Sequence, residues 1–135
     1  MNPLVEPPAE SFVEMMTETL KAGVDRLPGI GSDIKKAAVS EGAYAETPIE
    51  SLLSLFGAVG ELSKRLAGIN SPLLLLSSRD DHIVPTSNGD LLADQYGGSV
   101  ERVLLEESFH VATLDNDAPE IEERSVAFAL KVSAS

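Results

Sequence analysis

The stretch "PLLLLSS", Pro72 to Ser78, is a continuous run of leucines between a proline and two serines. Such a run fits either a buried strand or a fragment of a buried helix. Its short length and its flanking residues favour a strand that is covered on both faces, as in a parallel sheet. The run therefore predicts an α/β fold.

The elements after this run support that prediction. A helix is expected over residues 87–96, a second strand within "SVERVLLEE" (residues 99–107), and a helix from Pro119 to Val132. The order strand, helix, strand, helix is typical of an α/β sheet. Two strands make a thin sheet, because parallel strands normally have neighbours and are covered on both faces. We therefore expect that further strands are missing from these residues on the N-terminal side of the sheet.

The part of the chain before the first strand has a helical pattern. "SFVE", Ser11 to Glu14, predicts a capping box at the start of a helix that "LPGIGSD" ends, with a short helix over residues 33–41 after it. Apolar residues recur every fourth position at Phe12, Met16, Leu20 and Val24. Such a stripe fits either packing between helices or the lining of an apolar pocket.

"TPIE", Thr47 to Glu50, is the clearest helix start. Thr47 is expected to cap the helix and Pro48 to occupy its first position, with Gly68 at its end. The apolar stripe of this helix is Ile49, Leu52, Leu53, Phe56, Val59 and Leu66.

The composition argues against several classes of partner and site. The 135 residues, one domain's worth, include 22 acidic and 10 basic side chains for a net charge of −12, which argues against nucleic acids and anionic membrane surfaces as partners. The absence of cysteine excludes disulfides and thiolate metal sites and fits a cytoplasmic protein. "MNPLVEPPAE" has no basic start and no long apolar run, so neither a secretory signal nor a membrane span is expected.

Chemically active side chains follow both predicted strands. Asp80 and Asp81 come after the first strand, and His110 comes after the second, 110 − 81 = 29 residues beyond Asp81. A right-handed crossover places both loops on one rim of a parallel sheet. A carboxylate that binds one imidazole nitrogen leaves the other free to take a proton from a nucleophile. Spacing alone leaves open the simpler interpretation, a solvated Asp-Asp turn and a loop histidine bonded to backbone.

Other motifs predict less. "GIGSDI" lacks the third glycine and the lysine of nucleotide-binding loops, so we interpret it as a plain loop. "DND", Asp115 to Asp117, fails the calcium-loop pattern, and Asp115 or Asp117 is instead expected to cap the last helix. A metal site at Asp80, Asp81 and His82 lacks an evident third ligand on one face, so we expect no metal and no cofactor.

"TPIESLLSL", "SSRDDHIVP" and "SFHVATLD" add a family context. These segments resemble the C-terminal half of α/β-hydrolase carboxylesterases, in the bacterial esterase and monoacylglycerol-lipase-like group. The resemblance implies a serine, an aspartate and a histidine in that chain order, with Asp81 as the acid and His110 as the base. It also implies that residues 1–46 form a loop and a helical cap and that residues 47–135 form the C-terminal half of the hydrolase core.

The serine of such a triad is not found in these residues. Its elbow requires Gly-x-Ser-x-Gly; Ser99 has Gly97 before it but Glu101 in place of the second glycine, and Ser32 has neither glycine in place. We therefore expect this chain to supply the acid and the histidine of a carboxylic ester hydrolase. The expected substrate is a monoacylglycerol or an alkyl ester, and the chain alone is expected to be inactive. The alternatives are a non-catalytic interaction module that associates through an open sheet edge and a chain that is complemented by a separate serine-bearing half.

Overall fold

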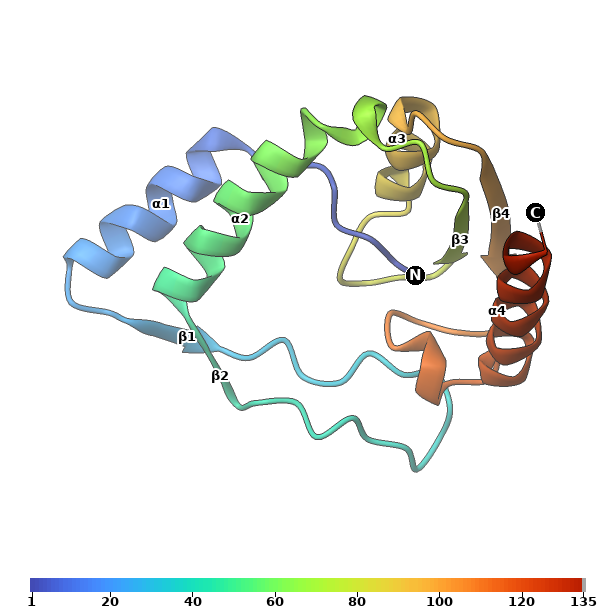
Figure 1. Cartoon of the computed structure of the whole chain (residues 1–135). Coiled ribbons are helices and arrows are strands. Elements are labelled where there is room, and N and C mark those ends of the chain that lie inside the picture. Colours follow the sequence, from blue (N-terminus) through green and yellow to red (C-terminus); the bar gives the residue numbers. More distant parts are fainter. Residues whose placement is uncertain (135) are drawn as a thin grey trace.

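The computed structural model describes residues 1–134 and contains the predicted parallel strand pair (Figure 1). Strand β3 (Leu73–Ser78) pairs with β4 (Val100–Leu105), with Leu73 opposite Val100 and Ser78 opposite Leu105. Helix α3 (Ser87–Gln95) connects the two strands. The expected α/β fold is confirmed, and both strands lie where the sequence predicted them.

The two faces of this sheet are covered by different helices. Leu75 belongs to an apolar cluster with Leu92 of α3, whereas its neighbour Leu76 packs with Leu105 and Ile121. Ile121 lies in α4 (Ala118–Ser133), which Figure 1 shows beside the strand pair. Since successive strand residues point to opposite faces, α3 covers one face and α4 the other. This arrangement explains why the leucine run does not alternate with polar residues.

A second pair of helices lies away from the sheet, as Figure 1 shows. Helices α1 (Glu10–Lys21) and α2 (Ile49–Ser63) pack together, and the rings of Phe12 and Phe56 meet edge to face with centroids 6.0 Å apart. Beyond the helices, β1 (Arg26–Pro28) and β2 (Glu46–Pro48) pair in antiparallel fashion. Two short 3₁₀ turns, Leu66–Gly68 and Ala112–Leu114, complete the described elements.

Three predicted helix ends are wrong in detail. Helix α1 has Ala9 at its N-cap and Ser11 already inside it, and α2 has Pro48 at its N-cap because Thr47 pairs with Leu27 in the β1–β2 ladder. Neither helix has a side-chain cap bond. Helix α2 ends at Ser63, before the 3₁₀ turn that contains Gly68.

The helix predicted over residues 33–41 does not form. The backbone N–H groups of Lys35 and Lys36 donate instead to the carboxylate of Asp115, at 2.7 and 2.8 Å. These bonds to a residue far along the chain replace the local bonds of a helix, and the segment crosses as a loop from the paired helices to the sheet (Figure 1).

The N-terminal residues lie along the edge of β3 that faces away from β4. Leu73 and Arg79 donate backbone bonds to Ser99 and Leu105 on the β4 side. On the other side Asn2 donates to Leu76 O at 3.0 Å, and Ser78 N donates to Oδ1 of Asn2 at 2.7 Å.

The division of the chain into a cap (residues 1–46) and a core (residues 47–135) stays a prediction. None of the helices in residues 1–134 has both the length and the apolar character needed to cross a bilayer.

Candidate active site

Asp81 and His110, from loops that follow β3 and β4, meet at the carboxyl end of the sheet. Nδ1 of His110 lies 2.8 Å from Oδ2 of Asp81. The two residues are far apart in sequence but adjacent here because parallel strands deliver their following loops to one rim. The structure therefore brings together the acid and the base that the sequence singled out, and it does not use Asp80 in this contact.

The carboxylate of Asp81 is held in a fixed orientation. Its Oδ1 accepts from the backbone N–H groups of Ile83 and Val84, both at 2.8 Å, and its side chain is only 2% exposed. A buried carboxylate needs such donors to remain charged without a large penalty. Its second oxygen is left to accept the Nδ1–H of His110, which places the acceptor lone pair of the neutral imidazole on Nε2.

His110 is partly open on the other side of its ring. Its side chain is 29% exposed, and no atom of residues 1–134 makes a hydrogen bond with Nε2. The backbone of the same residue is fixed at both ends: its N–H donates to Oδ2 of Asp33 at 3.0 Å, and its carbonyl accepts from Nδ2 of Asn2 at 2.7 Å. The imidazole can therefore exchange a proton at Nε2 while its loop stays anchored.

Sequence reasoning missed two of the residues that hold this loop. Asn2 connects the end of β3 to His110, and Ser78 donates from Oγ to the carbonyl of Phe109 at 2.7 Å. Ser78 is the last residue of β3, where polar side chains after an apolar run are a weak signal, whereas Asn2 reaches the strand from the N-terminal segment. The sequence showed the polar Ser77-Ser78 pair but gave no indication of its partners.

Asp33 is a third residue that sequence reasoning missed. Its Oδ1 lies 2.7 Å from Nδ1 of His82, and Oδ2 accepts from the backbone N–H of His82 at 3.2 Å as well as from that of His110. Burial acts to raise the pKa of Asp33, but the bonds from His82 and His110 outweigh it and leave the pKa below its ordinary value. His82, treated as a flanking residue in the sequence, also sets its ring edge to face on Phe109 at 4.4 Å.

Asp115 anchors the same loop from its far end. Its two carboxylate oxygens accept four backbone N–H groups, from Lys35, Lys36, Phe109 and Asn116, at 2.7 to 2.9 Å. Burial acts to raise the pKa of Asp115, but these bonds leave it below its ordinary value. The helix-cap role predicted for Asp115 or Asp117 is only partly right: Asp117 occupies the N-cap of α4, but its side chain accepts from Glu107 N.

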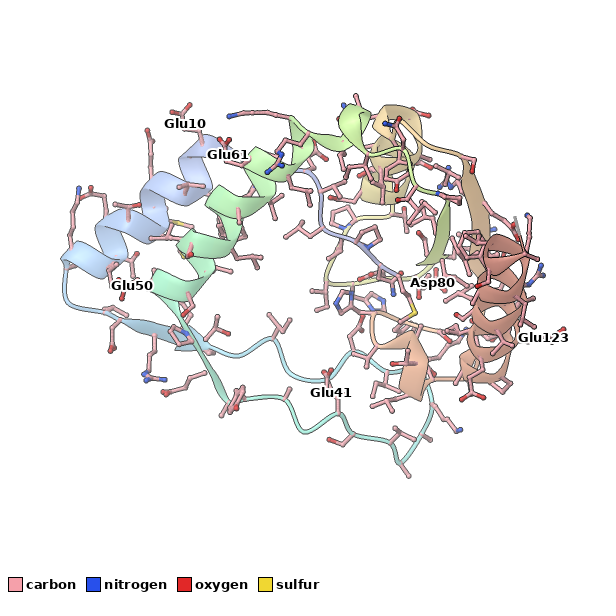
Figure 2. The ribbon with its side chains drawn as sticks, in the orientation of Figure 1. Glu10, Glu41, Glu50, Glu61, Asp80 and Glu123 are labelled. Carbon is pink, nitrogen blue, oxygen red and sulfur yellow. The ribbon has the colours of Figure 1, made fainter. Side chains whose placement is uncertain are left out.

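Two open cavities meet at His110. The larger has a volume of about 670 Å³ and a mostly apolar lining that includes Leu52, Leu55 and Phe56 of α2. The smaller, of about 390 Å³, has a more polar lining that includes Asp33, Glu41 and Tyr44. Figure 2 shows Glu41 on the loop between β1 and β2, whereas Glu10 and Glu123 lie at the periphery of the molecule. Both cavities are therefore bordered by His110.

Residues 1–134 contain no group of three or more His, Cys, Asp or Glu side chains that could hold a metal ion.

An ion pair joins the ends of β3 and β4 near the site. Arg79 forms it with Glu106 through two contacts, at 2.5 and 2.8 Å. The hydrogen bond to Glu106 raises the pKa of Arg79, and the same bond lowers that of Glu106.

Comparison with known proteins finds relatives of this chain. No protein-family model matches the chain. The thermostable monoacylglycerol lipase of Bacillus sp. (strain H-257) is 41% identical over 106 residues, which cover 78% of this chain and 42% of the lipase. The chain is homologous to part of that lipase. The resemblance to the monoacylglycerol-lipase-like group of α/β-hydrolases is confirmed by this homology.

A solved structure supports the same relationship. The structure, reported for the metagenome-derived lipolytic enzymes LipS and LipT, superimposes with a TM-score of 0.87 at 38% identity. The match covers 96% of this chain and 53% of that structure's chain. The hydrolase homologue described here thus spans about half the length, or less, of the lipolytic proteins that it matches.

Proposed function

We propose that Asp81 and His110 are the acid and base of a Ser-Asp-His triad that hydrolyses carboxylic esters, with the serine supplied from outside these 135 residues. The observation that carries the proposal is the 2.8 Å contact between Nδ1 of His110 and Oδ2 of Asp81 in a homologue of lipolytic enzymes. The partly exposed imidazole and the two cavities beside it are consistent with access for an ester.

In the proposed reaction, Nε2 of His110 takes the proton of the serine hydroxyl as the serine oxygen attacks the ester carbon. The protonated imidazole then donates that proton to the departing alkoxide, and the alcohol leaves. In the second half, Nε2 takes a proton from water, which attacks the acyl-enzyme, and returns it to the serine oxygen. Asp81 remains ionised throughout, holds the tautomer and stabilises the imidazolium.

The proposed substrate is an ester with an apolar acyl chain, such as a monoacylglycerol or an alkyl ester. The larger cavity along α2 offers burial for the acyl chain, and Asp33, Glu41 and Tyr44 in the smaller cavity offer hydrogen-bonding partners for the alcohol part. The similarity to the Bacillus protein, a monoacylglycerol lipase, supports this substrate class.

A chimera tests the proposal directly. The aligned segment of the Bacillus lipase is replaced by this chain, so that the rest of the lipase supplies the parts of the site that this chain lacks. We expect hydrolysis of a chromogenic ester by the chimera and its loss in His110→Ala. A folded chimera that is inactive, or one whose turnover survives His110→Ala, would contradict the proposed role.

The chain without such a partner is expected to be inactive, because these residues contain no Gly-x-Ser-x-Gly elbow. Incubation of the 135-residue chain with a fluorophosphonate probe and with a chromogenic ester should give neither labelling nor turnover. Labelling of a serine that depends on His110 would show that the nucleophile lies within this chain after all.

One feature favours a second function. Within residues 1–134 the sheet of β3 and β4 has two strands, and Asn2 provides the backbone bond to the outer edge of β3. An incompletely paired edge can bind another strand. A non-catalytic module that associates through this edge would form oligomers or complexes in sedimentation experiments but would give an inactive chimera.

A further inference from the structure

Asp33 contacts both loops of the proposed acid–base pair from a segment remote in sequence. Its Oδ2 accepts the backbone N–H of His110, and both of its oxygens contact His82, the residue directly after Asp81. Its backbone carbonyl also accepts from Val111 N at 3.1 Å. One residue thus connects the chain immediately after the acid to the backbone of the base.

The neighbouring contacts hold the Asp33 segment on the histidine loop from both directions. Asp33 accepts bonds from that loop, whereas Asp115 of that loop accepts from Lys35 and Lys36 of the Asp33 segment. Lys35 adds an ion pair between its Nζ and Glu107 at 2.9 Å. Because these bonds run in both directions, the segment has a defined position relative to His110.

The distances suggest what Asp33 controls. Asp81 is fixed by its own turn through Ile83 and Val84, so its orientation needs no help from Asp33. The loop of His110 also contains bonds of its own, such as that from Phe109 N to Asp115, but the N–H and the carbonyl of His110 itself bond outside the loop, to Asp33 and to Asn2. The side chain of Asp33 is 12% exposed, so water has little access to replace it as the acceptor. Loss of Asp33 would therefore release the base rather than the acid.

We propose that Asp33 is a positioning residue that sets the place of His110 opposite Asp81 by accepting the His110 backbone N–H while it is clamped by His82. This inference rests on the proposed function of Asp81 and His110 as an acid–base pair. The segment that contains Asp33 was predicted to belong to a cap. In this proposal it borders the cavities and also supports His110.

Proton NMR of the full 135-residue chain tests the proposal without any substrate. The chain has 2 histidines, so His82→Gln assigns the two sets of ring signals. The Nδ1–H of His110, bonded to a buried carboxylate, should give a slowly exchanging resonance far downfield. In Asp33→Ala we expect this resonance to be lost through exchange with water, while the dispersed methyl signals of the sheet core remain.

Asp117→Ala is the matched control. Asp117 also accepts one backbone N–H in the same region, that of Glu107, but it contacts neither histidine. This variant should keep the His110 resonance. Asp33→Asn, which keeps an oxygen acceptor but loses the charge, should shift the resonance without abolishing it, and it serves as the test if Asp33→Ala does not fold.

An unchanged His110 resonance in folded Asp33→Ala, or in Asp33→Asn if only that variant folds, would overturn the positioning role. Loss of the resonance in Asp117→Ala as well would also overturn it, since the effect would then be general to the loop. The NMR readout requires neither the serine nor an ester. The positioning role of Asp33 is therefore tested independently of the chimera experiment on the proposed function.

Discussion

The backbone N–H of Lys35 donates to Oδ2 of Asp115 over 2.7 Å, although 80 residues separate them in sequence. The bond joins the loop between β1 and β2 to the loop that carries His110. Asp115 is 1% exposed and is the common acceptor for both loops, so it acts as a link between two parts of the chain that local sequence does not connect.

Asp115→Ala should therefore destabilise the chain strongly. The substitution leaves four backbone N–H groups without their acceptor, and we expect a loss of about 3 kcal/mol in unfolding free energy, because hydrogen bonds to charged groups and unmet buried donors carry large costs. Urea unfolding followed by circular dichroism measures it. Asp117→Ala, which removes one such bond, should cost about 1 kcal/mol. Equal losses in the two variants would contradict the linking role.

The free energy of unfolding should also fall at acid pH because the carboxylates of Asp33 and Asp115 become protonated. The pKa values of Asp33 and Asp115 in the folded chain lie below their ordinary value of 3.8, so the unfolded chain binds protons first as the pH falls. The stabilisation is complete above the unfolded pKa and is lost as the pH falls through the folded values. Urea midpoints measured from about pH 6 to pH 2 should fall from about pH 5 downward, given ordinary aspartate pKa values.

Asp115→Asn provides the comparison for this pH dependence. An amide does not titrate, so the variant should be less stable at neutral pH and should show a smaller decline in acid than the natural chain. A decline of the same size in both proteins would assign the acid sensitivity to other carboxylates.

Sequence predicted the sheet because its signal is local. A continuous apolar run such as Leu73–Leu76 has few structural solutions, and the order of strands and helices then places Asp81 and His110 on one rim. The resemblance to the esterase group selected Asp81 over Asp80, a choice that the structure matches in geometry: the 2.8 Å contact to His110 is made by Asp81.

The contacts that sequence failed to predict are those between distant segments. "GIGSDI" contains Asp33, but nothing in its neighbours indicates that the carboxylate binds two histidine-bearing loops. The helix expected over residues 33–41 was inferred from local pattern and is absent because Asp115 takes the N–H groups of Lys35 and Lys36. The cap expected from Thr47 is wrong for a similar reason, since that residue pairs with Leu27.

The proposed acid–base pair predicts a specific kinetic effect in the chimera with the Bacillus lipase. Asp81→Asn should lower kcat roughly 10⁴-fold with little change in KM, since an amide favours the wrong imidazole tautomer and cannot stabilise the imidazolium. Asp80→Asn is the matched control, because Asp80 is exposed and does not contact His110. Initial rates over a range of ester concentrations separate kcat from KM. A similar loss in both variants would show that Asp81 has no special role.

The apolar cavity predicts how acyl-chain preference can be changed. Leu55 lines this cavity and is 49% exposed, so Leu55→Trp should narrow the space for an acyl chain with little effect on stability. In the chimera, kcat/KM for a dodecanoate ester should fall about 10-fold relative to that for a butyrate ester, because a few lost methylene contacts have effects of this size.

Leu62→Trp is the control for this change. Leu62 lies on the same helix α2 and is 42% exposed, but it is not among the residues that line the cavity. Its ratio of dodecanoate to butyrate hydrolysis should match that of the unsubstituted chimera. If Leu55→Trp lowers hydrolysis of both esters equally, the acyl chain binds elsewhere, and the cavity along α2 has no part in chain-length selection.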